Sequence, residues 1–176
     1  IATGTEVTLT LGRAFATWDG AALDTYAGAE AFAGLNRGPF TVQTTISAEG
    51  RRLDHVAEGG DRLRDLSAAA DVRLYLAAAQ HTLAATLRYE GGWRAHEVFQ
   101  LGLGGIDGVR GFVDYEKPVS RLLVLRFEER WNPRPLGPAA DVGFTLFGDI
   151  GRGWAGTAPF SVDTDWESAV GVGLRL

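Results

Sequence analysis

The stretch from Arg121 to Trp131 reads RLLVLRFEERW, and its alternation decides the fold class. The apolar parity consists of Leu123, Leu125, Phe127 and Trp131, whereas the ionisable parity consists of Arg126, Glu128 and Arg130. A strict period of two is typical of a β-strand and not of a helix. Apolar side chains on one face and pairable charges on the other predict the wall of a closed barrel, with lipid outside and ion pairs in the lumen.

The same alternation recurs along the whole chain. Eight segments carry it: residues 7–15, 26–33, 40–47, 71–76, 82–90, 121–131, 141–150 and 167–176. Most of them approach the ~10 residues that a tilted strand needs to cross a bilayer. The segment 26–33 is the weakest, because its alanines also favour a helix. The sequence therefore predicts one all-β domain over residues 1–176, an antiparallel transmembrane β-barrel of about eight strands.

The connections between these segments alternate in length, as in outer-membrane barrels. The short ones are residues 36–39, 80–81 and 132–138, and the long ones are 19–24, 50–69, 93–118 and 155–165. Placing the short turns in the periplasm puts both termini there. Aromatic residues near the strand ends are expected to form the interfacial girdles; they are Trp18, Tyr26, Tyr89, Trp93, Trp131, Trp154 and Trp166. A soluble sandwich or lipocalin-like barrel is the less favoured alternative, because a lipocalin has the inverse pattern.

Composition excludes several classes of protein. The net charge of -5 argues against a nucleic-acid partner. The absence of cysteine excludes disulfides and thiolate metal sites. The histidines, His55, His81 and His96, show no metal-ligand spacing, so no metal or cofactor is expected. No apolar window is long enough for a transmembrane helix. Because methionine is absent, we expect a processed or excised chain without its signal peptide, and GVGLRL at residues 171–176 favours a natural C-terminal end.

Two glycine-rich motifs carry the functional information. GGIDGVRGF spans Gly104–Phe112 in the longest connection, and FGDIGRGW spans Phe147–Trp154 in a later strand. The four glycines of the first motif allow tight turns against a wall. Glu128 and Asp149 fall on the inward parity of their strands. We therefore expect Arg110 to reach them through charge-assisted, bidentate hydrogen bonds.

The order and spacing of these motifs resemble the C-terminal half of the barrel of the outer-membrane assembly and two-partner-secretion transporter superfamily, the bacterial surface antigens. The resemblance is clear over residues 82–176. It implies that the VRGF loop folds into the lumen and that its arginine contacts the inner wall. The residues that match the family motifs are Arg110, Gly111, Phe112, Glu128, Arg130, Phe147, Asp149 and Gly151.

The chain also departs from the family pattern. Family barrels have about sixteen strands, within the usual range for such barrels. Here the last family strands and their Pro-x-Gly-Pro continuation are missing, and so are the first strands. The lateral gate of the family is therefore not expected in its usual form. We expect the eight strands to close on themselves, with the strand of Leu176 pairing to residues 7–15, since open edges in lipid are costly.

The resemblance implies an integral protein of the bacterial outer membrane, plugged by its VRGF loop, with a structural role or one in membrane-protein assembly or secretion. No enzymatic activity is expected. The implied partners are the lipid bilayer, lipopolysaccharide, the barrel-assembly machinery during insertion, and further copies of the chain. Two alternatives stay open. One is a lipid-modifying outer-membrane enzyme, suggested by Asp54 and His55, and the other is a half-barrel that forms a transport pore only as an oligomer.

Overall fold

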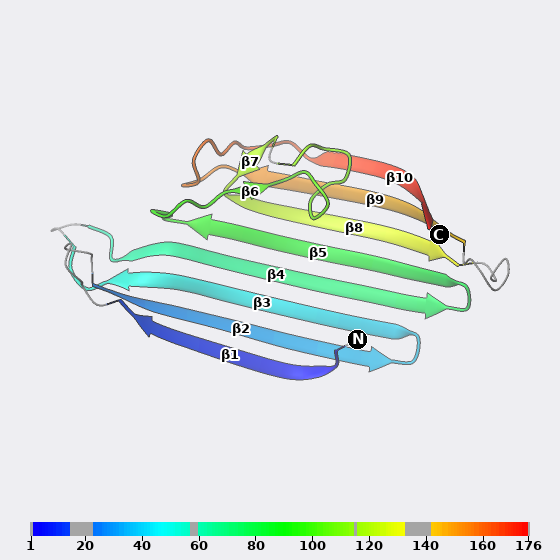
Figure 1. Ribbon diagram of the computed structural model, residues 1–176, viewed down its shortest axis with the longest axis horizontal. Helices are drawn as coiled ribbons and strands as arrows, with labels where there is room; N and C mark the ends of the chain where they lie inside the picture. The colour runs from blue at the N-terminus through cyan, green and yellow to red at the C-terminus, as the bar shows by residue number, and fades with distance from the viewer. Residues whose placement is uncertain (1, 15–22, 57–59, 115, 133–141, 176) are drawn as a thin grey trace.

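The computed structural model describes residues 2–14, 23–56, 60–114, 116–132 and 142–175. It is an all-β protein built on one antiparallel sheet of eight strands (Figure 1). In spatial order these are β1 (Gly4–Arg13), β2 (Asp24–Arg37), β3 (Phe40–Leu53), β4 (Leu63–Ala78), β5 (His81–Trp93), β8 (Arg121–Trp131), β9 (Gly143–Trp154) and β10 (Glu167–Arg175). None of the described residues forms a helix that is long and apolar enough to cross a membrane.

One face of the sheet is apolar from edge to edge. The strand register brings residues of the same parity together, so that Leu125 of β8 lies between Leu87 of β5 and Ile150 of β9. We call this the outward face. Its side chains are unusually exposed at the two edges: Leu11 is 82% exposed on β1 and Val170 is 86% exposed on β10. The predicted alternation is confirmed for all eight strands.

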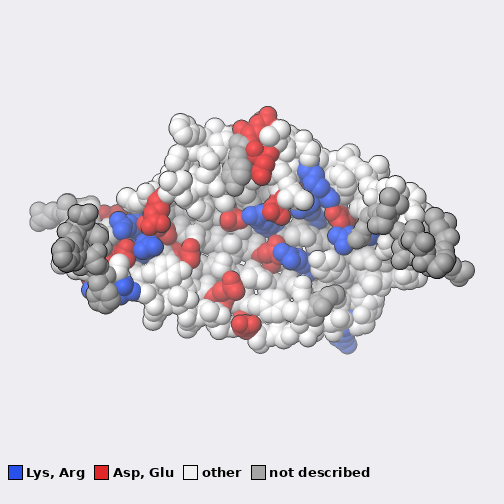
Figure 2. All heavy atoms as spheres, viewed as in Figure 1, with Lys and Arg blue, Asp and Glu red and all other residues white. Residues whose placement is uncertain are grey.

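The opposite face, which we call the inward face, is polar. It carries hydroxyls, glycines and ion pairs, and its acidic and basic side chains gather in a band across the middle of the sheet (Figure 2). Arg88 and Glu90 of β5 form one such pair at 2.5 Å. Ion pairs such as those of Arg88 with Glu90 and of Arg73 with Asp71 lower the cost of placing these charges away from bulk water.

A second layer lies on the inward face over β8 and β9 (Figure 1). It comes from the long connection after β5 and contains the short strands β6 (Leu101–Gly102) and β7 (Pro118–Val119), which pair with each other. The buried apolar cluster of the protein fills the space between this layer and the sheet. Its members are Leu101, Leu103, Val109, Val119, Leu122 and Val124. The core thus lies between the eight-stranded sheet and a layer that consists of loop and the two-stranded sheet of β6 and β7.

The sheet is not closed, and the expected self-closure is wrong for this chain. Among the described residues, β1 pairs only with β2 and β10 pairs only with β9, so both are edges. The physical reason lies on the inward face. A barrel of about eight strands has an interior just wide enough for side chains. Here the layer that contains β6 and β7 already occupies that side of β8 and β9, so curling the sheet shut would collide with it.

Several predicted boundaries change. The alanine-rich segment is a strand that extends over Asp24–Arg37, because Ala31 pairs with Val7 on one side and Ile46 on the other. Neighbouring strands decide such positions more than intrinsic helix propensity. The connection predicted at 50–69 shrinks to residues 54–62, since β3 and β4 continue into it.

Only some of the aromatic residues predicted for the interfacial girdles lie at strand ends on the outward face. Tyr26 was expected in it but lies on the inward face, where its hydroxyl donates to Oε2 of Glu49 at 2.5 Å. The residue is polar at one end, and the inward parity gives that end a carboxylate partner. Trp93, Trp131 and Trp154 lie at strand ends on the outward parity. Trp18, Phe15, Leu176 and most of the turns at 19–24 and 132–138 fall outside the described residues.

Candidate functional site

The candidate site is the tip of the long connection, where it touches the inward face of β8 and β9. The tip is folded tightly by its own backbone: the Val109 N–H donates to the Leu103 carbonyl at 2.8 Å and the Gly105 N–H donates to the Phe112 carbonyl at 3.1 Å. Gly111 has φ +89°, a left-handed conformation that glycine adopts without a steric penalty. This turn directs the neighbouring Arg110 down onto the sheet.

Arg110 binds two carboxylates at once. Its Nε and Nη2 donate to the two oxygens of Asp149, at 2.7 and 2.6 Å, and its backbone N–H donates to Oδ2 of the same residue at 3.1 Å. Its Nη1 donates to Oε1 of Glu128 at 2.5 Å. The Asp149 side chain is 0% exposed and that of Arg110 is 20% exposed. A bidentate guanidinium pair of this kind combines charge assistance with fixed geometry.

Arg130 completes the pairing of Glu128. Its Nε donates to the second oxygen of Glu128, Oε2, at 2.8 Å, and its Nη2 lies 2.7 Å from that oxygen. Glu128 therefore accepts a hydrogen bond from Arg110 on one oxygen and from Arg130 on the other. Two arginines and two carboxylates alternate, so that the charges of these four residues balance. This arrangement holds Glu128 in position for the loop.

Two further arginines fix the backbone of the loop tip. Arg126 of β8 donates from Nη1 to the Ile106 carbonyl at 2.8 Å, and Arg88 of β5 donates from Nη1 to the Asp107 carbonyl at 3.2 Å. The sequence reading did not include either residue in the site. Their inward parity could have indicated a place in the site, because Arg126 shares this parity with Glu128 and Arg130. Their partners are backbone carbonyls, which no sequence pattern specifies.

Apolar contacts fill the rest of the site. The Arg110 guanidinium stacks on the ring of Phe147, 3.8 Å from its centroid. Gly151 makes room for the loop, because a Cβ there would lie 2.8 Å from Cγ2 of Val109. Phe112 packs against the buried cluster, with the Lys117 ammonium 5.6 Å from the centroid of its ring.

The ion pairs keep the site charged. The hydrogen bonds that Arg110 donates to Asp149, followed by the one that it donates to Glu128, raise the pKa of Arg110 above its ordinary value. A raised pKa on a base means that the charged form is favoured at every pH below that value, so Arg110 stays protonated throughout the working pH range. Lys117 behaves in the same way, because its ion pair with Glu167 of β10 raises its pKa.

The structure brings together most of the residues selected from the sequence. Arg110, Glu128, Arg130, Phe147 and Asp149 are in mutual contact, and Gly111 and Gly151 provide the turn and the space. The alternative enzymatic pair consists of the adjacent residues Asp54 and His55. His55 is exposed, and Asp54 binds Arg13 at 2.5 Å. Within the described ranges, no group of three or more acidic or histidine side chains is arranged to hold a metal.

Comparisons with protein-family models, with curated proteins and with solved structures found no match to this chain.

Replacing Arg110 with alanine should detach the loop from the sheet. Asp149 would lose the three hydrogen bonds from Arg110 and keep only Arg126, whose Nε lies 3.7 Å from Oδ1. Breaking a buried ion pair typically costs about 3–5 kcal/mol, and Arg126 should place the loss at the lower end of that range. We expect the folded protein to lose heat resistance on a gel and the loop to become sensitive to protease. Arg94→Ala is the matched control, because Arg94 forms an exposed pair with Asp61. The double variant Arg110→Ala/Asp149→Asn should cost less than the sum of the two single changes. Strictly additive costs would contradict a direct interaction between Arg110 and Asp149.

Adding one methyl group at Gly151 should push the loop away. Its Cβ would lie 2.8 Å from Val109 and 3.2 Å from Cδ1 of Leu103, so Gly151→Ala should destabilise the protein by about 1–3 kcal/mol through overpacking. Gly148 of the same strand faces outward, and a Cβ there meets nothing closer than 3.9 Å. Gly148→Ala should therefore leave thermal unfolding unchanged. Equal effects of the two substitutions would exclude close packing of the loop on β9.

Proposed function

We propose that this chain forms part of the wall of a β-barrel in the bacterial outer membrane, related to the surface-antigen superfamily, and that it serves membrane-protein assembly or secretion. The observation that carries the proposal is the contrast between the two faces of the sheet. Leu9, Ile46 and Leu146 are 74%, 54% and 58% exposed on the outward face. Soluble proteins rarely expose apolar surface over a whole sheet. Lipid is the environment in which this pattern is stable.

The charge at the two ends of the sheet supports an orientation. Arginines on the outward parity stand at the ends next to the long connections: Arg13, Arg52, Arg121 and Arg152. Among the described residues at the opposite end, Arg37 alone has this position. Guanidinium groups bind phosphate in a bidentate manner. Long loops at the cell surface would place these arginines against the phosphates of lipopolysaccharide, with the short turns in the periplasm.

The open edges favour a composite barrel. The edge strands β1 and β10 run in opposite directions, because they are the first and the last of eight successive antiparallel strands. A second copy rotated about the barrel axis would therefore set its β1 antiparallel to β10 of the first copy. Two such contacts would satisfy both edges, which lipid cannot do. The resulting barrel would have twice the strands of one sheet and room for both loops.

The loop that Arg110 anchors on the sheet supports a lumen that is gated or plugged, and not a wide open pore. Arg110 and its partners anchor the loop over β8 and β9, whereas the inward face of β1 to β4 carries a polar hollow of about 450 Å³ lined by residues such as Thr10, Glu30 and Ser47. In a composite barrel these hollows would face the lumen. The proposed role needs no catalytic group.

Adjacent residues of β3 test the placement in lipid. Ile46 faces outward and Thr45 faces inward, where it pairs with Asp71 of β4. Near the bilayer midplane, arginine on the lipid side costs roughly 2–4 kcal/mol. We therefore expect Ile46→Arg to reduce insertion into phospholipid vesicles and Thr45→Arg to be milder. Insertion is measured by the heat-resistant folded band and by protease protection. If the two variants insert equally well, the outward face does not contact lipid.

Disulfide trapping tests the composite barrel, and the chain has no cysteine of its own. Leu9→Cys on β1 is combined in turn with cysteine at Val170, Val172 or Leu174 on β10, which samples the register. We expect oxidation in membranes to give a covalent dimer for at least one pair.

The control for this trapping is Val42→Cys combined with the same β10 positions, because Val42 lies in the interior of the sheet on β3 and should not cross-link. An internal disulfide in a monomer would support self-closure. Absence of any cross-link would count against pairing between copies.

A further inference from the structure

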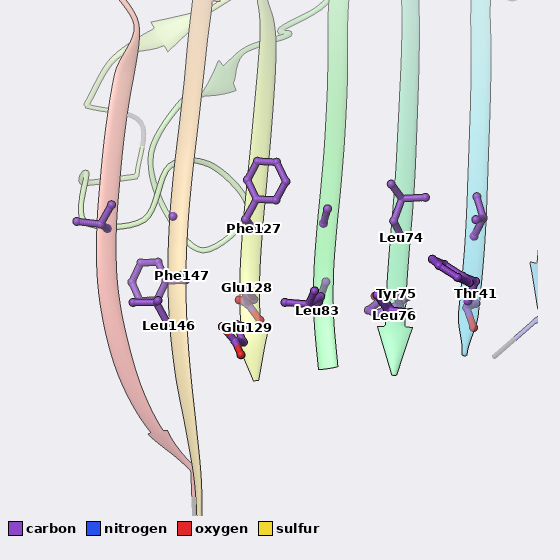
Figure 3. Close-up of a pocket in the computed structure, with 16 residues that line it drawn as sticks. Thr41, Leu74, Tyr75, Leu76, Leu83, Phe127, Glu128, Glu129, Leu146 and Phe147 are labelled. Carbon is purple, nitrogen blue, oxygen red and sulfur yellow. The ribbon is translucent and has the colours of Figure 1, made fainter. Parts of the chain in front are cut away.

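A groove crosses the outward face near the short-turn ends of the strands. It has a volume of about 660 Å³, and its lining is apolar, with Leu76, Leu83, Phe127, Leu146 and Val170 among the contributors. Figure 3 shows Leu83, Phe127 and Leu146 on neighbouring strands, with Glu129 toward the end of β8. The volume lies within the range of small-molecule sites, ~300–1,000 Å³. An apolar groove on a face that meets lipid has the chemistry to hold an acyl chain.

A polar pair stands at the end of this groove. Nδ1 of His81 lies 2.9 Å from Oε1 of Glu129, and the two side chains are 50% and 46% exposed. Trp131 stacks between His81 and Phe144, with ring centroids 6.2 and 5.7 Å apart. These residues line a second hollow of about 500 Å³, which shares Glu129 and Leu146 with the groove. The apolar groove therefore continues directly into a polar, aromatic mouth.

Glu129 is unusual for its position. Among the described strand residues, it is the one carboxylate on the outward parity, because the other acidic residues of the eight strands face inward. It sits two residues before the end of β8, and His81 is the first residue of β5. At this depth a charged side chain is tolerated, because the cost of an outward charge falls to ~0–1 kcal/mol near the interfaces. Neither residue takes part in the contacts that hold the loop on β8 and β9.

We propose that this groove and its mouth bind one phospholipid with an amine headgroup. The inference rests on the proposed function, since it requires the outward face to contact lipid. One acyl chain lies in the groove along Leu83 and Phe127, and the headgroup ammonium donates to the Glu129 carboxylate. Trp131 and Phe144 pack against the glycerol region, the level at which aromatic side chains gather in membranes.

The charge of the mouth selects the headgroup. Glu129 repels a headgroup that is only anionic and attracts a zwitterionic one that carries an ammonium. His81 holds one oxygen of Glu129, which leaves Oε2 for the ligand. Because charge-assisted hydrogen bonds are about twice as strong as neutral ones, loss of the charge should be measurable in binding.

The test uses the full chain reconstituted in vesicles of phosphatidylethanolamine and phosphatidylglycerol with identical acyl chains. After extraction in mild detergent, native mass spectrometry counts the lipid retained. We expect one phosphatidylethanolamine per chain in preference to phosphatidylglycerol. Glu129→Gln should lower that preference about tenfold, the effect of one charge-assisted hydrogen bond. Ala85→Trp fills the groove and should reduce retention of both lipids.

Glu30→Gln is the matched control, because it removes the same charge from the inward face of β2. It should leave retention of both lipids unchanged. If the chain inserts and forms its heat-resistant band but retains both lipids equally, or responds alike to Glu129→Gln and Glu30→Gln, the lipid site is wrong and the membrane proposal stands. If the chain does not insert into the vesicles, both proposals fail together.

Discussion

The buried carboxylate of Asp149 is the group on which the second layer of this structure depends. It lies on a strand, it is shielded from water by the loop, and an isolated charge in that position would be unstable. Arg110 compensates it with three hydrogen bonds, and this requires the tight turn at Gly111 and the bare backbone at Gly151. The apolar cluster around Val109 is then compressed between the loop and the sheet. Removal of any one part leaves another unsatisfied.

That layer also explains the shape of the sheet. Among the described residues, the buried apolar part of this layer packs on β8 and β9, so the two halves of the inward face differ in character. The covered half is packed and ion-paired, whereas the half formed by β1 to β4 is open and lined by hydroxyls and carboxylates. A narrow barrel has no space for the loop. A wider barrel made with strands from a second copy accommodates it and satisfies both edges, which links the openness of the sheet to the proposed function.

The outward face differs between its two ends in a related way. Arginines stand beside the long connections, and the pair of His81 and Glu129 stands beside the short turns. Between them the surface is apolar. Under the proposed function, the arginine end would meet the phosphates of one leaflet and the end with Glu129 the headgroup ammonium of the other.

The sequence by itself determined the eight strands, the face that each side chain occupies, and the pairing of Arg110 with Asp149 and Glu128. These follow from a period of two and from the need of a buried arginine for carboxylates, both of which are local or nearly local properties. Only the tertiary structure decided that the sheet stays open and that Arg88 and Arg126 hold the loop backbone. These depend on the volume of the loop layer and on where its carbonyls fall. Volume and carbonyl positions are set by the folded arrangement of distant segments, which alternation along the chain does not encode.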